Sequence, residues 1–357
     1  MHIAVVTKNM GAGGAERVIS QLLKEWTKSG VSCTLICMHP GDVFYSVCEG
    51  VERYDVPKFS ENYNVDKLLR YRHLRKVIRK MSPDIVLSLP EEIGIYVLGA
   101  LIGTGIPVVV SERNDPWQMP NKKITRILRK LMYPFAKGIV FQTEQATEFF
   151  SPAIRKKGIV LPNPLDLTRI PQPHEGERKK VIIGAGRLVP QKNFRLLIDA
   201  FSDFYENHRD YKLIIYGEGY LRDELEEYAR KLPHGVISFP GVSEHLLEEI
   251  KSASMFVLSS DYEGLPNVLI EAMAMGMPVA ATDCRPGGAA SLIDHGKNGM
   301  LVPMGDACRL SGAMKKLAND LDFANSVGKN ALRIRECLNS EDVSKAWMEY
   351  LNSRLLV

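Results

Sequence analysis

The sequence predicts an α/β protein made of two doubly wound domains, each a parallel β-sheet with helices on both faces. Short β-branched runs alternate with helix-like stretches along the whole chain, and this alternation is typical of parallel strands in a covered sheet. The chain has 357 residues, which is too long for one ordinary core. Its content of 45% hydrophobic and 25% charged residues is that of a globular protein.

The first half of the chain alternates predicted strands with predicted helices. The helices cover residues 15–28, 66–81 and 122–136, where apolar side chains recur at helical spacing. The strands are short runs rich in Val and Ile, namely HIAVVT, VSCTLIC, DIVLSL, IPVVVS and KGIVFQT. Because strands and helices alternate, we expect this half to form one domain.

The same alternation resumes after a proline-rich connection at residues 161–175, which suits a domain boundary. The second set of strands is VIIGAGR, YKLIIYG, GVISF, SMFVLSS and PVAATD. We therefore expect domains at residues 1–165 and 166–338. Residues 339–357 form a terminal amphipathic helix, whose apolar face must pack on another element; that face holds Val343, Trp347, Tyr350 and Leu351.

Several features favour a reducing cytoplasm. The six cysteines form no CxxC pair and no zinc-finger spacing, so neither a disulfide framework nor a structural zinc is indicated. The first residues, MHIAVVTKNM, favour a first strand over a signal peptide because no basic region precedes the apolar run. Residues 93–110 carry no charge, but the GTGIP turn inside them favours a buried helix, a turn and a buried strand over a membrane span.

The net charge of +4 hides an asymmetry between the halves. Residues 1–165 contain 23 Lys and Arg against 15 Asp and Glu, whereas the remainder contains 23 against 27. The basic first half is therefore the one to examine for contacts with phosphates or membranes.

A glycine cluster, KNMGAGGAER, follows the first predicted strand and runs into a helix. Gly11, Gly13 and Gly14 let the backbone approach a ligand and direct helix N-terminal N–H groups at an anion. A dinucleotide site would require GxGxxG and an acid at the end of the second strand. Here the glycines are spaced differently and the second strand ends in CMHPGD, so a nicotinamide cofactor is the disfavoured alternative.

The second half opens with VIIGAGRLVPQKN, in which Arg187 and Lys192 stand five positions apart in a loop between a strand and a helix. Both cations can reach one pyrophosphate, Arg through its planar fork and Lys as a point charge. Either residue alone would be interpreted as a solvated loop charge. Gly184 and Gly186 beside the two cations make a phosphate site the better interpretation.

Two acids eight positions apart occupy the stretch SSDYEGLPNVLIEAMAMGMP. Glu263 lies in the loop after a strand, and Pro266 can begin a helix because its missing N–H is not needed there. Glu271 lies about a turn and a half into that helix. Carboxylates accept hydrogen bonds from paired hydroxyls, and an unpaired one among apolar side chains would be costly. One dipole acid and one core ion pair are the alternative.

With these motifs the chain resembles the retaining glycosyltransferases of family 4. The similarity covers essentially the whole chain, including the GAGGAER loop, the PNP of residues 162–164 and the terminal helix. It implies the GT-B fold, in which two Rossmann-like domains face each other across a cleft and the terminal helix returns to the first domain. It also implies a nucleotide-sugar donor, no cofactor and no metal.

The resemblance assigns roles to individual residues. Arg187 and Lys192 would hold the donor pyrophosphate, Glu263 would bind hydroxyls of the transferred sugar, and Glu271 would bind the ribose. The loop PGVSEH would lie against the base. Further donor contacts would come from Gly13, Gly14, Gly186, Val242, Gly264, Leu265 and Pro266, although Pro266 has no N–H to offer.

The resemblance also implies a mechanism without an enzyme nucleophile. The acceptor hydroxyl attacks from the face that the diphosphate leaves, so the protein positions the reactants and stabilises developing charge. A glycosidase carboxylate pair is the alternative, but hydrolysis has no use for pyrophosphate-binding cations. Where many family members place a His, this chain reads VVVSERNDP. Arg113 cannot act as a general base, so it would stabilise charge or orient the acceptor.

Two basic segments in the first half carry apolar residues at helical spacing. Residues 66–81 contain Arg72, Arg75, Arg79 and Lys80, and residues 121–138 contain six cations and no acid. Solvated helix surface is one interpretation. The other is docking on an anionic bilayer or on the pyrophosphate of a lipid-linked acceptor, with Glu112 on the acceptor side. Nucleic acid is a poorer candidate because no aromatic stacking platform accompanies the charges.

Together these features predict a metal-independent, retaining glycosyltransferase that moves a hexose or N-acetylhexosamine from a nucleotide sugar, UDP-linked, to a lipid-linked or oligosaccharide acceptor. The resemblance is to bacterial enzymes of cell-surface glycan assembly, including N-acetylgalactosamine, capsule and exopolysaccharide transferases. We expect a cytoplasmic protein that is peripheral at the inner face of the cell membrane. A two-domain nucleotide-sugar epimerase and a non-catalytic nucleotide-sugar-binding homologue are the open alternatives.

Overall fold

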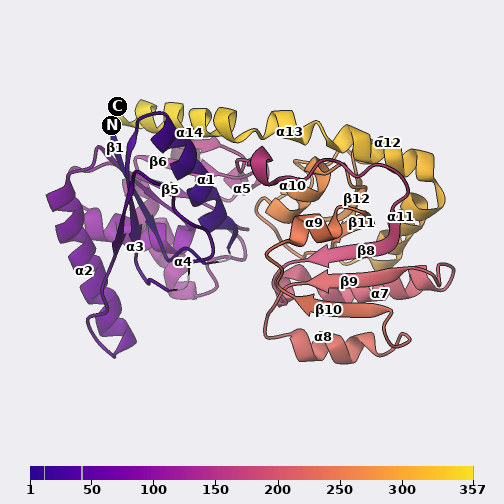
Figure 1. Ribbon diagram of the computed structural model, residues 1–357. Helices are drawn as coiled ribbons and strands as arrows, with labels where there is room; N and C mark the ends of the chain where they lie inside the picture. The colour runs from indigo at the N-terminus through magenta and orange to yellow at the C-terminus, as the bar shows by residue number, and fades with distance from the viewer. Residues whose placement is uncertain (12, 42, 357) are drawn as a thin grey trace. The chain divides into compact units, whose positions relative to one another are not determined.

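A computed structural model describes residues 1–11, 13–41 and 43–356, and Figure 1 shows its elements. Ala12 of the predicted glycine loop and Val357 of the predicted terminal helix lie outside these residues. The chain divides into two compact units: Met1–Pro164 with Ser340–Val357, and Leu165–Asn339. The sequence placed these divisions at residues 165 and 339.

The first unit is built on a seven-stranded sheet in which every neighbouring pair is parallel. The strand order is β3-β2-β1-β4-β5-β6-β7. Strand order therefore reverses between β1 and β4, where a doubly wound sheet binds its ligands. The strands are β1 (His2–Thr7), β2 (Ser32–Cys37), β3 (Val51–Asp55), β4 (Ile85–Ser88), β5 (Val108–Ser111), β6 (Gly138–Phe141) and β7 (Gly158–Val160).

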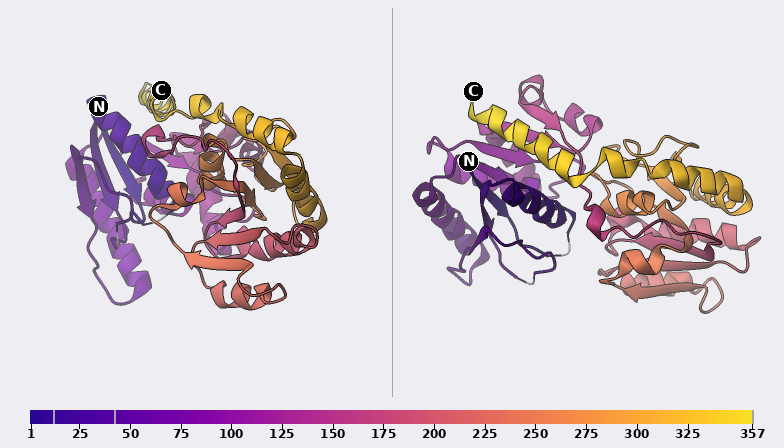
Figure 2. Two further views of the ribbon diagram at one scale, coloured as in Figure 1. Left: turned by 45° about the vertical axis from the view of Figure 1, so that its right-hand side comes forward. Right: turned by 45° about the horizontal axis from the view of Figure 1, so that its top comes forward.

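Helices cover both faces of this sheet. On one face α1 (Gly14–Lys28) packs beside α14 (Ser340–Leu355), as Figures 1 and 2 show. On the other face lie α2 (Tyr63–Met81), α3 (Glu91–Leu101) and α4 (Lys123–Met132), followed by the 3₁₀ turn η1 (Tyr133–Phe135). Two short helices, α5 (Glu144–Glu148) and α6 (Pro152–Arg155), precede β7.

The terminal helix α14 is fixed to the first unit by apolar and polar contacts. Its predicted apolar face is buried in the core that also holds α1. The Trp26 indole donates to the Ser344 carbonyl at 3.1 Å, and the Tyr350 hydroxyl accepts from the Ile139 N–H at 2.8 Å. Residues that are far apart in the sequence therefore complete one core.

The second unit contains a six-stranded parallel sheet in the order β10-β9-β8-β11-β12-β13. Here the order reverses between β8 and β11. The strands are β8 (Lys179–Ala185), β9 (Lys212–Tyr216), β10 (Ile237–Gly241), β11 (Ala253–Leu258), β12 (Val279–Asp283) and β13 (Met300–Pro303).

The second sheet has a separate hydrophobic core on each face. One core includes α10 (Asn267–Ala274), α9 (Leu246–Ile250) and α13 (Ile334–Cys337), and the other includes α7 (Phe194–Tyr205) and α11 (Ala307–Asn319). The latter core also receives α8 (Arg222–Ala229) and α12 (Leu321–Ala331). The 3₁₀ turns η2 (Leu167–Arg169) and η3 (Pro190–Lys192) precede β8 and α7. The predicted α/β class is thus confirmed in both units.

Every predicted strand is present, but three strands were not predicted. These are β3, β7 and β13, and each forms the edge of a sheet. Two of them, VERYD and GIV, have no fully buried position, and the third, MLVP, has one. The apolar pattern that identifies a strand in a sequence comes from its buried residues. Short edge strands that are partly exposed lack this pattern and were therefore not predicted.

Candidate functional site

The predicted donor residues gather at the reversal of strand order in the second unit. Gly186, Arg187 and Lys192 follow β8, whereas Glu263 follows β11, the adjacent strand on the other side of the reversal. The carboxyl ends of these parallel strands lie at one edge of the sheet, which is the usual position of a ligand site in this fold class. The structure therefore brings the four residues into one loop cluster.

Lys192 and Glu263 form an ion pair in this cluster, through the Lys192 ammonium and Glu263 Oε1. Their side chains are 12% and 9% exposed. The Ser260 hydroxyl donates to the same carboxylate oxygen at 2.8 Å. A charge this deeply buried requires a partner, so each of the two ionic groups fixes the other at the strand ends.

Polar contacts join the loop after β8 to the loop after β11. The Gln191 carbonyl accepts from the Asp261 N–H at 2.9 Å, and the Gln191 amide donates to the Tyr262 carbonyl at 3.0 Å. The Asn193 amide donates to Asp261 Oδ1 at 2.7 Å. Backbone and side-chain bonds thus hold the two loops in one geometry, as a preorganised binding site requires.

Close backbone packing explains why glycine occupies two positions around the cluster. A Cβ on Gly217 would lie 1.9 Å from the Gly186 carbonyl oxygen, and a Cβ on Gly288 would lie 1.6 Å from the Gly264 oxygen. The sequence analysis missed both contributing loops, YGEG after β9 and RPGG after β12. Their signal was available, since each is a glycine pair directly after a predicted strand.

The other predicted donor residues surround this cluster with different exposures. Leu265 is buried, Pro266 caps α10, and Glu271 lies inside that helix at 5% exposure. Val242 follows β10 and is exposed. Burial, followed by the charge of Glu263, raises the pKa of the neighbouring Cys284 thiol to about 12, so this cysteine stays protonated.

Arg187 differs from Lys192 because its side chain is exposed. Its guanidinium donates to Gln191 Oε1 at 3.3 Å. The cluster therefore offers one cation held by a carboxylate and one that faces solvent. Such a combination can bind a diphosphate while keeping a carboxylate available to hydroxyl groups.

In the first unit, the glycine loop and Arg113 follow β1 and β5. Gly13 caps α1 in an extended conformation, and α1 begins at Gly14. A Cβ on Gly13 would lie 2.0 Å from the carboxylate of Glu16, so a larger residue there would require the Glu16 side chain to move. The sequence analysis did not single out Glu16.

Arg113 is held by contacts on one side of its guanidinium. Its Nη2 donates to Asn163 Oδ1, which also accepts from the Gln142 amide at 2.9 Å. Nε and Nη1 are buried and have no hydrogen-bond partner in the described part of the chain. Burial lowers the pKa of Arg113 to about 10. Two unsatisfied nitrogens on one guanidinium are costly, so this side chain is suited to a ligand oxygen.

Glu112 is enclosed, which corrects its predicted place on the acceptor side. Its side chain is 1% exposed; Oε2 lies 3.3 Å from Arg129 Nη1, and Oε1 accepts from the Tyr133 hydroxyl. Burial raises the pKa of Glu112 despite the nearby guanidinium. Because both oxygens contact α4 and η1, this carboxylate anchors those elements and does not face a ligand.

A second buried acid lies beside this ion pair. Glu91 is 3% exposed, and its Oε2 accepts from the Arg113 N–H at 3.2 Å. Burial and then the charge of Glu112 raise the pKa of Glu91 to about 7. The backbone at Arg113 is therefore supported by a group that titrates near neutral pH.

The cations of α2 do not share one environment. Arg72, Arg79 and Lys80 are exposed. Arg75 instead donates to the Ala100 and Ile102 carbonyls at 2.7 Å each, satisfying groups at the C-terminal end of α3. Arg75 therefore differs from the other three cations, because its guanidinium also binds backbone carbonyls within the unit.

Within the described residues, no group of three or more His, Cys, Asp or Glu side chains could hold a metal ion. Nor does any described helix have the length and apolar character needed to cross a bilayer.

Comparison with known families identifies the class of protein. Residues 12–169 match the model described as Glycosyltransferase Family 4, and residues 168–333 match the one described as Glycosyl transferases group 1. The two matches together span residues 12–333, which include Arg113, Arg187, Lys192 and Glu263. The chain belongs to the glycosyltransferases that these two models describe.

Individual relatives agree with this family. The chain is similar to the GalNAc-α-(1→4)-GalNAc-α-(1→3)-diNAcBac-PP-undecaprenol α-1,4-N-acetyl-D-galactosaminyltransferase of Campylobacter jejuni, with 26% identity over 98% of each chain. Its fold is similar to that of HepE from Anabaena in complex with UDP and glucose, with a TM-score of 0.82, 18% identity and coverage of 99% and 100%.

A sucrose-phosphate synthase from Thermosynechococcus elongatus has a TM-score of 0.84 at 18% identity, covering 99% of each chain. Both structural likenesses show the fold, and the predicted GT-B class is confirmed. The protein is a glycosyltransferase.

Proposed function

We propose that this glycosyltransferase moves a hexose or N-acetylhexosamine from a UDP-sugar to a lipid-linked glycan during assembly of a bacterial cell-surface polysaccharide. The Campylobacter relative is named for an undecaprenol diphosphate-linked acceptor, and the HepE structure contains UDP and glucose. These names support the donor and acceptor classes. Arg187 is the cation best exposed to meet a diphosphate arriving from solvent.

The observation that carries the proposal is the Lys192–Glu263 ion pair at the β8/β11 strand ends. In the proposed complex Lys192 and Arg187 bind the diphosphate, and Glu263 accepts hydrogen bonds from hydroxyls of the sugar. Glu271 binds the ribose, and the loop at Val242 lies against the base. Gly13, Gly14 and Gly186 allow close approach of the backbone.

The proposed reaction retains the configuration of the anomeric carbon. The acceptor hydroxyl forms its bond to that carbon from the face on which the bond to the diphosphate breaks, and a phosphate oxygen of the leaving group takes the hydroxyl proton. Lys192 and Arg187 stabilise the charge that develops on the diphosphate. We propose that the reaction needs no metal, since the two cations serve the leaving group.

On the acceptor side, we propose that Arg113 uses its unpartnered Nε and Nη1 to orient the acceptor or stabilise charge. The exposed cations Arg72, Arg79 and Lys80 provide electrostatic attraction to an anionic bilayer, which would place the protein at the inner face of the membrane. Each such charge contributes about 1 kcal/mol near the surface.

A direct test screens UDP- and GDP-sugars for thermal stabilisation, because a ligand that binds only the folded state raises its stability. The best donor is then incubated with a lipid-diphosphate glycan, with and without a chelator. We expect UDP release that requires the acceptor and persists with the chelator, and an axial product linkage from an axial donor by NMR. Release without acceptor, or an inverted product, would contradict the proposal.

Membrane attachment is tested by flotation with vesicles containing about one third anionic phospholipid. We expect salt-sensitive binding that is lost when Arg72, Arg79 and Lys80 become Ser, since surface potentials act on exposed cations. Arg222 of the second unit pairs with two glutamates, so Arg222→Ser is the control. Salt-insensitive binding, or equal loss in the control, would contradict this part of the proposal.

A further inference from the structure

Helix α4 carries apolar side chains on two sides: Leu128 and Met132 pack against the core, and a second set faces outward. Thr125 and Arg129 are its buried residues, and Arg129 is only 2% exposed. The apolar residues at i, i+3 and i+7 instead face out, since Ile124 is 62% exposed and Ile127 and Leu131 are each 56% exposed. A surface helix normally places its apolar stripe toward the core, so this stripe requires another explanation.

The buried Arg129 helps to fix which side of α4 faces inward. Its guanidinium donates to the Met119 and Pro116 carbonyls at 2.9 and 2.7 Å and contacts the Glu112 carboxylate. These bonds attach the side of α4 that also carries Leu128 and Met132. The exposed apolar face continues past the helix to Phe135, which is 61% exposed, and forms the kind of patch that marks an interaction surface.

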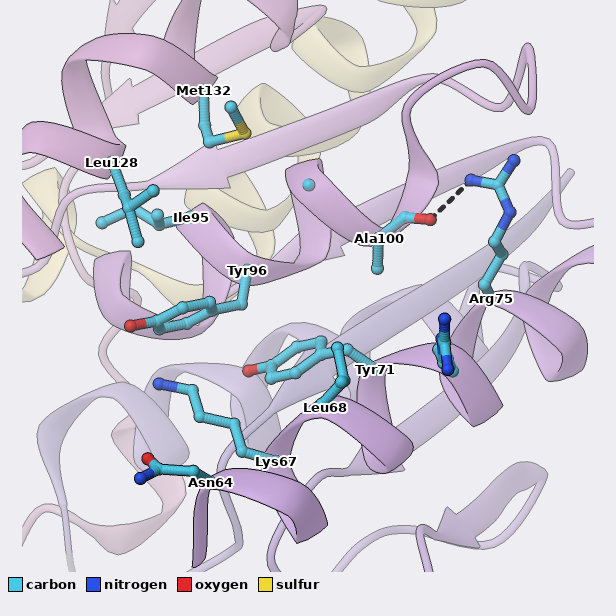
Figure 3. Close-up of a pocket in the computed structure, with 12 residues that line it drawn as sticks. Asn64, Lys67, Leu68, Tyr71, Arg75, Ile95, Tyr96, Ala100, Leu128 and Met132 are labelled. Carbon is cyan, nitrogen blue, oxygen red and sulfur yellow. Dashed lines mark hydrogen bonds between the residues drawn. The ribbon is translucent and has the colours of Figure 1, made fainter.

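A cavity of about 520 Å³ opens beside this face, between α2, α3 and α4. Its walls are mainly apolar and aromatic, with Tyr71 and Leu68 from α2, Tyr96 from α3, and Leu128 and Met132 from α4. Figure 3 shows these side chains around the space. The volume falls in the range of about 300 to 1,000 Å³ that is typical of small-molecule sites.

The absence of a side chain at Gly99 contributes to this cavity. A Cβ there would meet only Met132 Sδ, at the ordinary contact distance of 3.6 Å. Cations accompany the apolar walls. Lys67 Nζ lies 3.4 Å from the centre of the Tyr96 ring, beside it in Figure 3, and the exposed Arg72 also lines the cavity.

We propose that this cavity takes one hydrocarbon chain of a phosphate-bearing membrane lipid while the outer face of α4 lies in the bilayer interface. The lipid phosphate is met by Lys67 and Arg72, and Ile124, Ile127, Leu131 and Phe135 contact the acyl region. The inference rests on the membrane attachment proposed above, but adds a specific lipid site and an apolar mode of insertion.

Charge and chemistry favour a lipid over a protein occupant. The exposed cations around the face, including Lys122, Lys123 and Lys130, are accompanied by no acid between residues 121 and 138. A second copy of this chain would bring the same cations together, which is unfavourable. Exposed Leu and Ile combined with Lys and Arg on one helical surface are typical of helices that lie in an anionic membrane interface.

The site is tested first without a membrane, by titrating octyl, decyl and dodecyl phosphate below their micelle concentrations and measuring heat. Each CH₂ that enters an apolar site should improve Kd about fourfold, the equivalent of about 0.8 kcal/mol. Gly99→Leu should abolish this chain-length dependence by filling the cavity. Gly99→Ala is the matched control, because it gives a similar gain in helix propensity with one small methyl group.

We expect wild type and Gly99→Ala to show the chain-length dependence and Gly99→Leu to bind at least tenfold more weakly. Inorganic phosphate should not compete measurably, since it lacks a chain. Equal Kd values for the three alkyl phosphates, or unchanged binding by Gly99→Leu while circular dichroism shows both variants folded, would overturn the proposed site.

A second measurement separates the lipid site from membrane attachment. Vesicles contain a phosphatidylglycerol with a diazirine near the end of one acyl chain, and labelled residues are identified by mass spectrometry after illumination. We expect labels on Tyr96, Leu128 or Met132 in wild type, and their loss in Gly99→Leu although flotation persists. Labels confined to Ile124, Ile127 and Leu131 would overturn chain entry and leave surface docking. Alkyl phosphate binding without flotation would overturn attachment alone.

Discussion

The two units have the same plan, a parallel sheet whose order reverses beside its first strand, yet they place charge differently at the carboxyl ends of their strands. In the second unit, Lys192 and Glu263 pair across two strand-end loops. In the first unit, Glu112 is sealed against α4, and Arg113 is left with two guanidinium nitrogens that have no hydrogen-bond partner among the described residues. The same fold therefore supports one site assembled from loop charges and another assembled from a buried network.

The two units also differ in the side chains that they leave exposed. Arg187 in the second unit faces solvent beside the ion pair, as expected for capture of an anionic ligand. In the first unit the inward Arg129 leaves apolar side chains on the outer face of α4. A buried charge can thus determine function indirectly, because the side of a helix that it occupies decides which residues meet solvent.

The largest effect is expected at the ion pair of the second unit. Glu263→Gln removes the charge that balances Lys192 and weakens acceptance from sugar hydroxyls, so transfer should fall at least about 10³-fold. Turnover with saturating donor and acceptor measures this. Lys192→Ala should cause a similar loss, and the double variant should be little worse than either single variant because the two groups act together.

The control for this experiment is Lys180→Ala. Lys180 and Asp210 form an ion pair in the same unit, but their side chains are 54% and 57% exposed, and Lys180 is the second residue of β8, at the end opposite the site loops. We expect activity within about twofold of wild type, as surface pairs contribute little. Wild-type turnover by Glu263→Gln would show that the second unit does not use this pair in catalysis.

The next largest effect, on stability, is expected at Arg129 of α4. Arg129→Ala leaves Glu112 buried without its cation and should lower the free energy of unfolding by about 3–5 kcal/mol. Ile127→Ser on the exposed face should change it by no more than about 0.5 kcal/mol. Urea unfolding of both variants compares them. A larger cost for Ile127→Ser than for Arg129→Ala would mean that α4 packs through its apolar side.

The raised pKa of Glu91, about 7, predicts a pH dependence in the first unit. The folded protein keeps a proton on this carboxyl between about pH 4.5 and 7, where the unfolded chain loses it, so its contribution to stability declines as pH rises through that window. Glu91→Gln should remove this decline. The stability of the variant relative to wild type should therefore rise by on the order of 3 kcal/mol across the window.

Urea midpoints at closely spaced pH values measure this difference. Glu175→Gln, in the second unit, has no comparable burial and should show a flat difference over the same range. A flat profile for Glu91→Gln would mean that Glu91 is ionised throughout, with Arg113 balancing its charge.

The candidate site residues of the second unit could be predicted because they lie in short loops. Arg187 and Lys192 lie in one loop, Glu263 lies in another, and each loop follows an apolar strand that a sequence reading finds. The fold class followed from the same alternation. The donor roles of these residues stay predictions, since they depend on a bound nucleotide sugar.

The first unit was harder to predict from the sequence because its main features depend on contacts between residues that are distant in the sequence. Residues 121–138 correctly suggested a basic amphipathic helix, but helical spacing alone cannot tell which face turns inward. Only the position of Glu112 at the end of β5 shows that Arg129 points in and Ile127 points out. Likewise, Arg75 looked like another surface cation until the C-terminal carbonyls of α3 were placed beside it.

The smallest predicted effect separates binding from stability at Arg113. Its Nε and Nη1 contribute no protein hydrogen bond within the described chain, and burial lowers its pKa, so the folded protein gains little from this cation. Arg113→Gln should therefore leave the unfolding free energy unchanged or slightly higher, because the Gln142 amide still satisfies Asn163 Oδ1. Turnover should nevertheless fall about 10- to 100-fold, the loss of one hydrogen bond to a charged group.

Arg113→Lys should recover part of that loss by restoring a positive charge without the planar fork of the guanidinium. Thermal melts and acceptor titrations of both variants test this: a parallel loss of stability and activity would make Arg113 a structural anchor like Arg129, and would remove the main difference between these two arginines.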